Sequence, residues 1–139
     1  MRRKSGYELG KEVSVARMQH IALRTNNLER TRAFYVNDLG LEEANYDADV
    51  GRLWLSLEDG FTLIFDRSSE TLSPLSITYL GLELSSFAAV DQMFTNVSAL
   101  YDIEKDLRER YRHAQGPYGF FMRDPNGYRL KIFKYTYEA

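Results

Sequence analysis

Histidine and cysteine, the side chains that most often bind transition metals or carry out nucleophilic and acid–base chemistry, are scarce in this chain. It has 139 residues, with two histidines and no cysteine. Without cysteine, the chain cannot form a disulfide, a thiolate zinc site, an iron–sulfur cluster or a cysteine nucleophile. His20 and His113 limit imidazole ligands to two per chain. Aromatic residues, in contrast, make up 14% of the sequence.

Two side chains could do acid–base chemistry without a metal. His20 could act as a general acid or base beside Tyr79, because imidazole titrates near neutrality. Lys131, if it lies in an apolar cleft, could act as a base or as a Schiff-base amine. The sequence has no nucleophile–base–orienter spacing, no phosphate-binding glycine loop and no Rossmann fingerprint. These residues therefore leave binding and catalysis both open.

The sequence contains an internal repeat, and the structure formed by this repeat must position His20, Tyr79 and Lys131. Residues 20–28 resemble residues 79–87, since both alternate apolar residues and then place two helix-capping types before an apolar residue. Residues 59–65 resemble residues 126–132, since each begins with an Asp-Gly or Asn-Gly turn and continues as a strand-like run. The sequence therefore predicts two β-α-β-β-β modules, which we call module one (residues 18–66) and module two (residues 77–135).

Within the modules, alternation and capping residues predict the individual elements. Asn26 or Asn27 is expected to cap a helix over residues 28–37 that ends at Gly40, and Ser86 is expected to cap the helix of module two. The charged segment 102–110 is either a helix extension or a polar edge strand, and residues 1–16 are expected to be a mobile extension or a partner-binding arm. The predicted strands cover residues 18–24, 42–48, 52–57, 61–66, 77–84, 119–123 and 128–135.

Three motifs resemble those of the vicinal oxygen chelate superfamily, which includes glyoxalase I, extradiol dioxygenases and bleomycin-resistance proteins. They are His20-Ile21-Ala22-Leu23, then Phe34-Tyr35 followed by Leu39-Gly40-Leu41, and the segment 116–127 with its Asp-Pro-Asn-Gly turn. The resemblance implies an α+β fold in which two β-α-β-β-β modules curl into an open barrel around a concave cleft. It further implies one domain over residues 17–139, and a homodimer.

The resemblance also implies metal ligands on the first and last strands of each module. The aligned residues are His20, Ile64, Tyr79 and Lys131, of which only the histidine matches. Isoleucine has no donor atom, and an ammonium group repels a divalent cation. We therefore expect no family-type metal site and no cofactor. A displaced metal site formed by His20, Asp66 and Glu83 remains an alternative, whereas His113 is expected to be exposed to solvent.

Without a metal, the alternation of the strands still describes a cleft with aromatic walls and cationic groups for an aromatic or anionic ligand. Ala22 and Gly81 occupy equivalent repeat positions, where small residues would keep the cleft open. Alternatively, His20 and Tyr79 could hydrogen-bond each other, Lys131 could pair with Asp66 or Glu83, and Trp54 could belong to the core or a dimer interface. The candidate ligand-binding residues are His20, Arg24, Trp54, Thr62, Ile64, Asp66, Tyr79, Glu83, Tyr118, Phe120, Arg129 and Lys131.

Composition narrows the class of protein further. The formal net charge of −2 argues against capture of nucleic acid, and no apolar run is long enough to span a membrane. We expect a cytoplasmic homodimer, partly because a chain without cysteine suits a reducing compartment. The expected function is binding or sequestration of a small molecule, as in resistance proteins. The alternatives are a metal-dependent or degenerate lyase, isomerase or dioxygenase, and a purely structural or regulatory dimer module.

Overall fold

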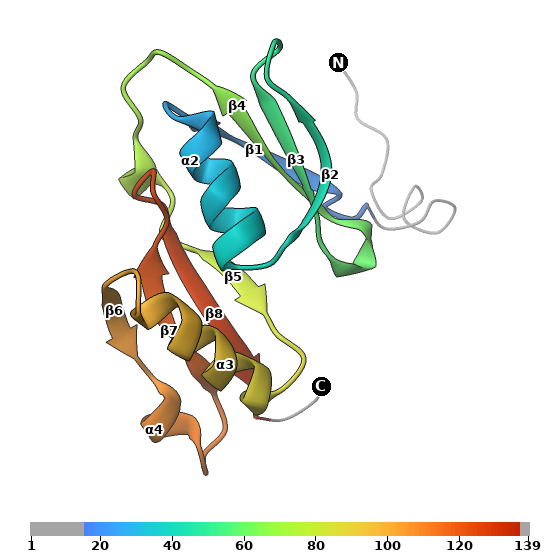
Figure 1. Cartoon of the computed structure of the whole chain (residues 1–139). Helices are drawn as coiled ribbons and strands as arrows, with labels where there is room; N and C mark the ends of the chain where they lie inside the picture. The colour runs from blue at the N-terminus through green and yellow to red at the C-terminus, as the bar shows by residue number, and fades with distance from the viewer. Residues whose placement is uncertain (1–15, 137–139) are drawn as a thin grey trace, which may run out of the picture.

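The computed structural model describes residues 16–136, so most of the predicted N-terminal extension lies outside the described residues. In this part of the chain, module one forms a four-stranded sheet of order β1-β4-β3-β2 (Figure 1). β1 pairs with β4 in parallel, and the other pairs are antiparallel. The strands are β1 (His20–Thr25), β2 (Glu42–Asp47), β3 (Arg52–Ser56) and β4 (Thr62–Arg67).

Module two repeats this topology in a second sheet of order β5-β8-β7-β6. The first and last strands of the module, β5 and β8, again pair in parallel. The two separate, unclosed sheets and their matching connectivity confirm the predicted α+β fold of two β-α-β-β-β modules. The strands are β5 (Leu80–Glu83), β6 (Ile103–Asp106), β7 (Pro117–Arg123) and β8 (Arg129–Tyr135).

Each module carries a helix that begins at the predicted cap. Asn27 accepts a hydrogen bond from the backbone N–H of Arg30 at 3.0 Å and caps α2 (Leu28–Arg32). α2 continues directly as a π-helical segment, η1 (Ala33–Asp38), and Gly40 follows with φ +76°, the left-handed conformation that glycine adopts readily. In module two, Ser86 caps α3 (Phe87–Ser98). Short 3₁₀ turns, η2 (Glu58–Gly60) and η3 (Pro74–Ser76), lie in the connections.

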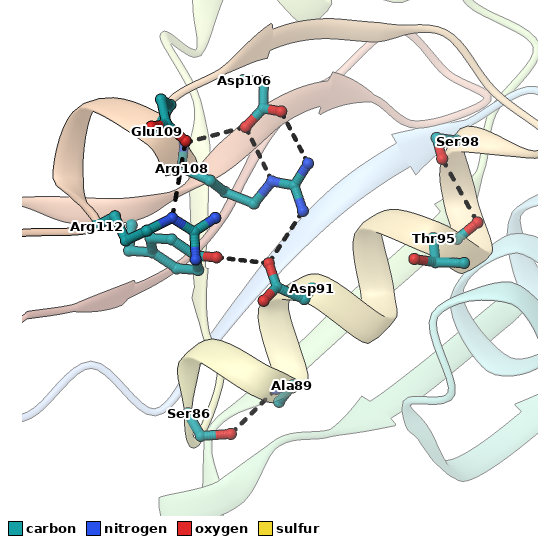
Figure 2. A network of polar contacts seen from close by, with 10 residues as sticks. Ser86, Ala89, Asp91, Thr95, Ser98, Asp106, Arg108, Glu109 and Arg112 are labelled. Carbon is teal, nitrogen blue, oxygen red and sulfur yellow. Dashed lines mark hydrogen bonds and ion pairs between the residues drawn. The ribbon is translucent and has the colours of Figure 1, made fainter.

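The charged segment that the sequence left unassigned contains an edge strand and a short helix, β6 and α4 (Arg108–Tyr111). Figure 2 shows how this segment is fixed to α3: Arg108 donates to both Asp91 and Asp106 at 3.0 Å. The hydroxyl of Tyr118 on β7 donates to the same Asp91 carboxylate at 2.6 Å. The guanidinium of Arg108 also lies 3.7 Å from the centre of the Phe94 ring. These contacts join the charged segment of module two to the helix that covers its sheet.

The core lies between the helices and one face of each sheet. In Figure 1, α2 and α3 both lie on the viewer's side of the strands. The residues beneath α2 include Leu53, Leu55 and Phe65, all with no exposed surface. Alternation along each strand leaves the opposite face without a helix, and we call this surface the open face of its module. The open-face residues used below are Ala22, Arg24, Arg52, Trp54, Ile64 and Asp66 in module one, and Tyr79, Gly81, Phe121, Arg129, Lys131 and Phe133 in module two.

The Asp-Pro-Asn-Gly turn between β7 and β8 joins module two to module one. Asp124 in this turn accepts a hydrogen bond of 2.6 Å from the buried hydroxyl of Tyr35. Thr25, at the end of β1, donates to Asn126 at 2.7 Å, and the Tyr128 hydroxyl donates to the Arg24 carbonyl at 2.9 Å. Burial raises the pKa of both Tyr35 and Asp124. The motif that marks the end of the repeat therefore makes polar contacts between the two modules.

Candidate functional site on the open faces

The parallel pairing of β1 and β4 sets the positions on the open face of module one. His20 lies beside Thr62, while Ile64 lies between Ala22 and Trp54 on the neighbouring strands. His20 is exposed, and its Nδ1 lies 2.6 Å from the side-chain oxygen of Gln19. The structure does not show the hydrogen bond between His20 and Tyr79 that was considered from the sequence, because Tyr79 instead packs edge-on against Phe121.

The two arginines of this face are paired with carboxylates. Arg52 donates to Asp66 at 2.5 Å, and that hydrogen bond raises the pKa of the guanidinium. Arg24 donates to Glu70 in the connection between the modules, also at 2.5 Å. Asp66 therefore pairs with Arg52, a residue that the sequence candidates did not include, and not with Lys131. Arg52 could have been identified from the sequence, because it lies two positions before Trp54 on β3 and therefore on the same face.

A recess of about 230 Å³ lies at the edge of module one. Ala22 and Arg24 line it from β1, and Leu72 and Ile77 line it from the connection to module two. Ala22, a small exposed residue of β1, forms part of the wall of this recess. A second recess of about 260 Å³ lies along α2 beside the Arg32–Glu43 ion pair, on the helix side of the sheet and away from the candidate residues.

On the open face of module two, the ammonium of Lys131 is surrounded by aromatic rings. It lies 4.8 Å from the centre of the Phe133 ring, 5.4 Å from that of Tyr79 and 5.8 Å from that of Tyr135. Lys131 is only 9% exposed. Phe121, the cross-strand neighbour of Lys131 on β7, is the fourth aromatic residue beside it. We call Lys131 with these four aromatic residues the lysine cage.

Three other charged residues of this face, Glu104, Arg123 and Arg129, pair with one another. Glu104 on β6 accepts a hydrogen bond from Arg123 at 2.8 Å and another from Arg129. Desolvation opposes ionisation of Glu104, but the two arginine hydrogen bonds outweigh it and lower the pKa of its carboxyl group. The guanidinium of Arg129 also lies 3.9 Å from the centre of the Phe121 ring. Arg129 is therefore already held by a carboxylate and a ring.

Glu83 does not neutralise Lys131 either. Its carboxylate lies 3.9 Å from Lys134 and accepts a hydrogen bond from the backbone N–H of Tyr135. Within residues 16–136, the Lys131 ammonium has neither a carboxylate partner nor a hydrogen bond. The internal ion pair between Lys131 and Asp66 or Glu83, considered from the sequence, is therefore not found in this part of the chain.

Tyr118 and Phe120 do not lie where the sequence analysis placed them. Both are fully buried beneath α3, where Tyr118 stacks on Phe87 at 4.0 Å and Phe120 packs edge-on against Phe94 at 5.2 Å. The register of β7 explains this, because Phe120 pairs with the core residue Ile132 whereas Phe121 pairs with Lys131. Their expected position on the cleft wall is wrong, and Phe121 is the aromatic residue of β7 on the open face. Trp54 is half-buried on the open face of module one.

The residues at the implied metal positions do not fit a divalent ion. Ile64 supplies no donor atom, and Lys131 places a cation where the resemblance implies a carboxylate. The displaced site is not assembled either, because Asp66 lies beside Arg24, four residues along β1 from His20, or about 13 Å at strand spacing. Among residues 16–136, no group of three or more histidine, aspartate or glutamate side chains could hold a metal ion. His113 is exposed between α4 and β7, as expected.

Comparisons with known proteins agree with the fold. The model of the Glyoxalase/Bleomycin resistance protein/Dioxygenase superfamily matches residues 17–132. A glyoxalase/dioxygenase structure from Nostoc punctiforme is 19% identical, with a TM-score of 0.68 and a match covering 99% of each chain. Lactoylglutathione lyase from Agrobacterium tumefaciens is 20% identical, with a TM-score of 0.65, over 86% of this chain and 94% of that one. At sequence identities of 20% or less, these similarities show that the fold is shared and no more than that. A comparison with curated protein sequences finds no match.

Proposed function

Because this chain belongs to the Glyoxalase/Bleomycin resistance protein/Dioxygenase superfamily, we propose that it binds an aromatic or anionic small molecule on its open faces, without the family metal site. The observation that carries the proposal is the lysine cage. A nearly buried ammonium among aromatic rings occupies the position where the resemblance implies a metal-binding carboxylate. A cation built into the protein can attract ligand oxygens without a metal ion.

The surroundings of Lys131 support binding of a small organic molecule. Ligand sites usually combine apolar and aromatic walls with a few polar groups that fix orientation. Tyr79, Phe121 and Phe133 provide the rings, and Gly81 on the neighbouring strand leaves the backbone exposed. None of the helices in residues 16–136 has the length and apolar character needed to span a membrane. We propose sequestration of the ligand in the cytoplasm, as expected from composition.

Metal analysis and a ligand screen test this proposal together. Protein purified without added metal is expected to contain less than stoichiometric divalent metal by plasma emission spectroscopy. In a thermal-shift screen, aromatic acids are expected to raise the melting temperature, since a ligand at 100 times its Kd adds about 2.7 kcal/mol of stability. Stoichiometric metal that is lost in a His20→Ala variant would contradict the proposal, as would a screen of aromatic and anionic compounds without any stabilising ligand.

A second candidate function is catalysis by a metal-dependent or degenerate lyase, isomerase or dioxygenase. It is favoured by His20 at the first metal position and by the fold shared with lactoylglutathione lyase from Agrobacterium tumefaciens. Activity assays with hemithioacetal and catechol substrates distinguish the two candidates. Turnover that depends on added metal and on His20 would favour the enzyme, whereas ligand binding without turnover would favour sequestration.

A further inference from the structure

The lysine cage holds a charge that the described part of the protein does not neutralise. Lys131 is more than nine-tenths buried, and among residues 16–136 its ammonium lies near three aromatic rings and has no carboxylate partner. Burial of an ammonium without a carboxylate or hydrogen-bond acceptor is costly, and cation–π contacts of about 0.5–2 kcal/mol offset part of that cost. The site therefore has a remaining attraction for a negatively charged group.

Lys131 differs in this respect from the arginines around it. On the two open faces, Arg24 pairs with Glu70, Arg52 with Asp66, and both Arg123 and Arg129 with Glu104. Lys105, on the edge strand β6, is exposed to water, which screens its charge. Among the described residues, Lys131 is thus the cation of this face that is buried and has no carboxylate partner.

The same rings argue against a cationic ligand. Aromatic rings grouped around one point attract quaternary ammonium and methylammonium ligands through their electron-rich faces. In this protein, Lys131 already lies over the rings of Tyr79, Phe133 and Tyr135. A cationic ligand would be repelled by Lys131, whose ammonium already occupies the space among the rings. The complementary ligand is therefore an anion.

Gly81 lies beside Lys131 on the neighbouring strand of the open face. This glycine is the register partner of Lys131 on β5, and it is exposed. A Cβ atom at position 81 would lie 3.3 Å from the edge of the Phe133 ring, closer than an ordinary contact, so the ring would have to shift slightly. Tyr79, which is 42% exposed, borders the same strand. Bare backbone between two aromatic side chains suits a flat ring that lies on the sheet.

We propose that Lys131 binds the acid group of a planar aromatic carboxylic acid whose ring lies over Gly81, between Tyr79 and Phe133. This inference rests on the proposed function and specifies its ligand class. One buried ammonium suits a single negative charge. The carboxylate is expected to bond directly to the Lys131 ammonium, because a charge-assisted hydrogen bond is about twice as strong as a neutral one.

Calorimetric titration with matched probes tests the inference. The probes are 2-naphthoate and its neutral amide, 2-naphthamide, which share a ring and differ in charge. The wild-type protein is expected to bind 2-naphthoate at least tenfold more tightly than 2-naphthamide. Lys131→Met should weaken 2-naphthoate binding at least tenfold and leave 2-naphthamide binding nearly unchanged. Gly81→Val should weaken binding of both probes, because its side chain fills the space for the ligand ring and displaces the ring of Phe133.

The control variant is Lys134→Met, which removes the same charge three residues along β8. Lys134 pairs with Glu83, outside the lysine cage, so this variant should bind 2-naphthoate like the wild type. Lys131→Met should melt at the same or a higher temperature, because methionine fills the space without a buried charge. A purely structural role for Lys131 predicts the opposite pattern, a lower melting temperature with unchanged probe affinity.

The outcomes separate the inference from the proposed function. Equal affinity of wild type for both naphthalene probes overturns the role of Lys131, while the proposed binding of aromatic molecules stands. Unchanged 2-naphthoate affinity in Lys131→Met also overturns that role. If the wild type binds neither probe, the ligand class is overturned, and the thermal-shift screen then decides the proposed function.

Discussion

At the scale of single residues, the buried hydroxyl of Tyr35 is a sensitive contact between the two modules. Tyr35→Phe removes the donor to Asp124 and leaves a buried carboxylate oxygen without that partner. We expect the free energy of unfolding to fall by about 1–3 kcal/mol, as measured by urea denaturation. Tyr101→Phe is the matched control, because the Tyr101 hydroxyl bonds Asp38 in a less buried place. Its loss should cost about 0.5–1 kcal/mol; equal losses would contradict this account.

Asp124 gives a prediction for pH. Burial raises its folded-state pKa, although Tyr35 and the backbone amides of Tyr128 and Asn126 donate hydrogen bonds to it. The native state therefore favours the protonated carboxyl more than the unfolded state does, where the pKa is about 3.9. That stability is present below about pH 4 and is lost as the pH rises through the folded-state pKa. The stability of wild type relative to Asp124→Asn should fall in urea titrations as the pH rises above about 4, the unfolded-state pKa; a rise would contradict the prediction.

At the scale of elements, Arg108 determines how firmly β6 and α4 are attached. Its guanidinium bonds Asp91 on α3 and Asp106 on β6 and lies over the Phe94 ring (Figure 2). Arg108→Met should lower the free energy of unfolding by about 1–2 kcal/mol and increase hydrogen exchange of β6. Arg110→Met, an exposed neighbour on the same helix, should change stability by less than about 0.5 kcal/mol. Equal effects of the two variants would argue against the attachment.

The elements also show what the sequence could and could not predict. Both helix caps and most strands could be predicted, because capping types and alternation are local signals. The face of β7 could not, since Tyr118, Phe120 and Phe121 belong to a run that is apolar on both faces. Only pairing with β8 decides which ring reaches Lys131. Ion pairs such as Arg52–Asp66 were missed for the same reason, because their partners come from different strands.

At the scale of the whole molecule, each sheet leaves both of its outer strands without a second partner strand among the described residues. β1, β2, β5 and β6 each lie at the end of a sheet, and such edges are open to pairing with another chain. We expect a homodimer, which the family resemblance also implies. Sedimentation velocity should give a mass about twice 16.2 kDa. A single monomer species that persists at high protein concentration would contradict this expectation.

The turn that joins the modules also bears on the order of events during synthesis. The strands of module one are complete once residue 67 has been made, yet Thr25 and Tyr35 bond to Asn126 and Asp124. Until the ribosome has added those residues near the end of the chain, the N-terminal half keeps polar groups without their native partners. The first module to be translated therefore reaches its final stability only after the last turn has been made, so a nascent chain stalled before residue 124 should be markedly more sensitive to proteases.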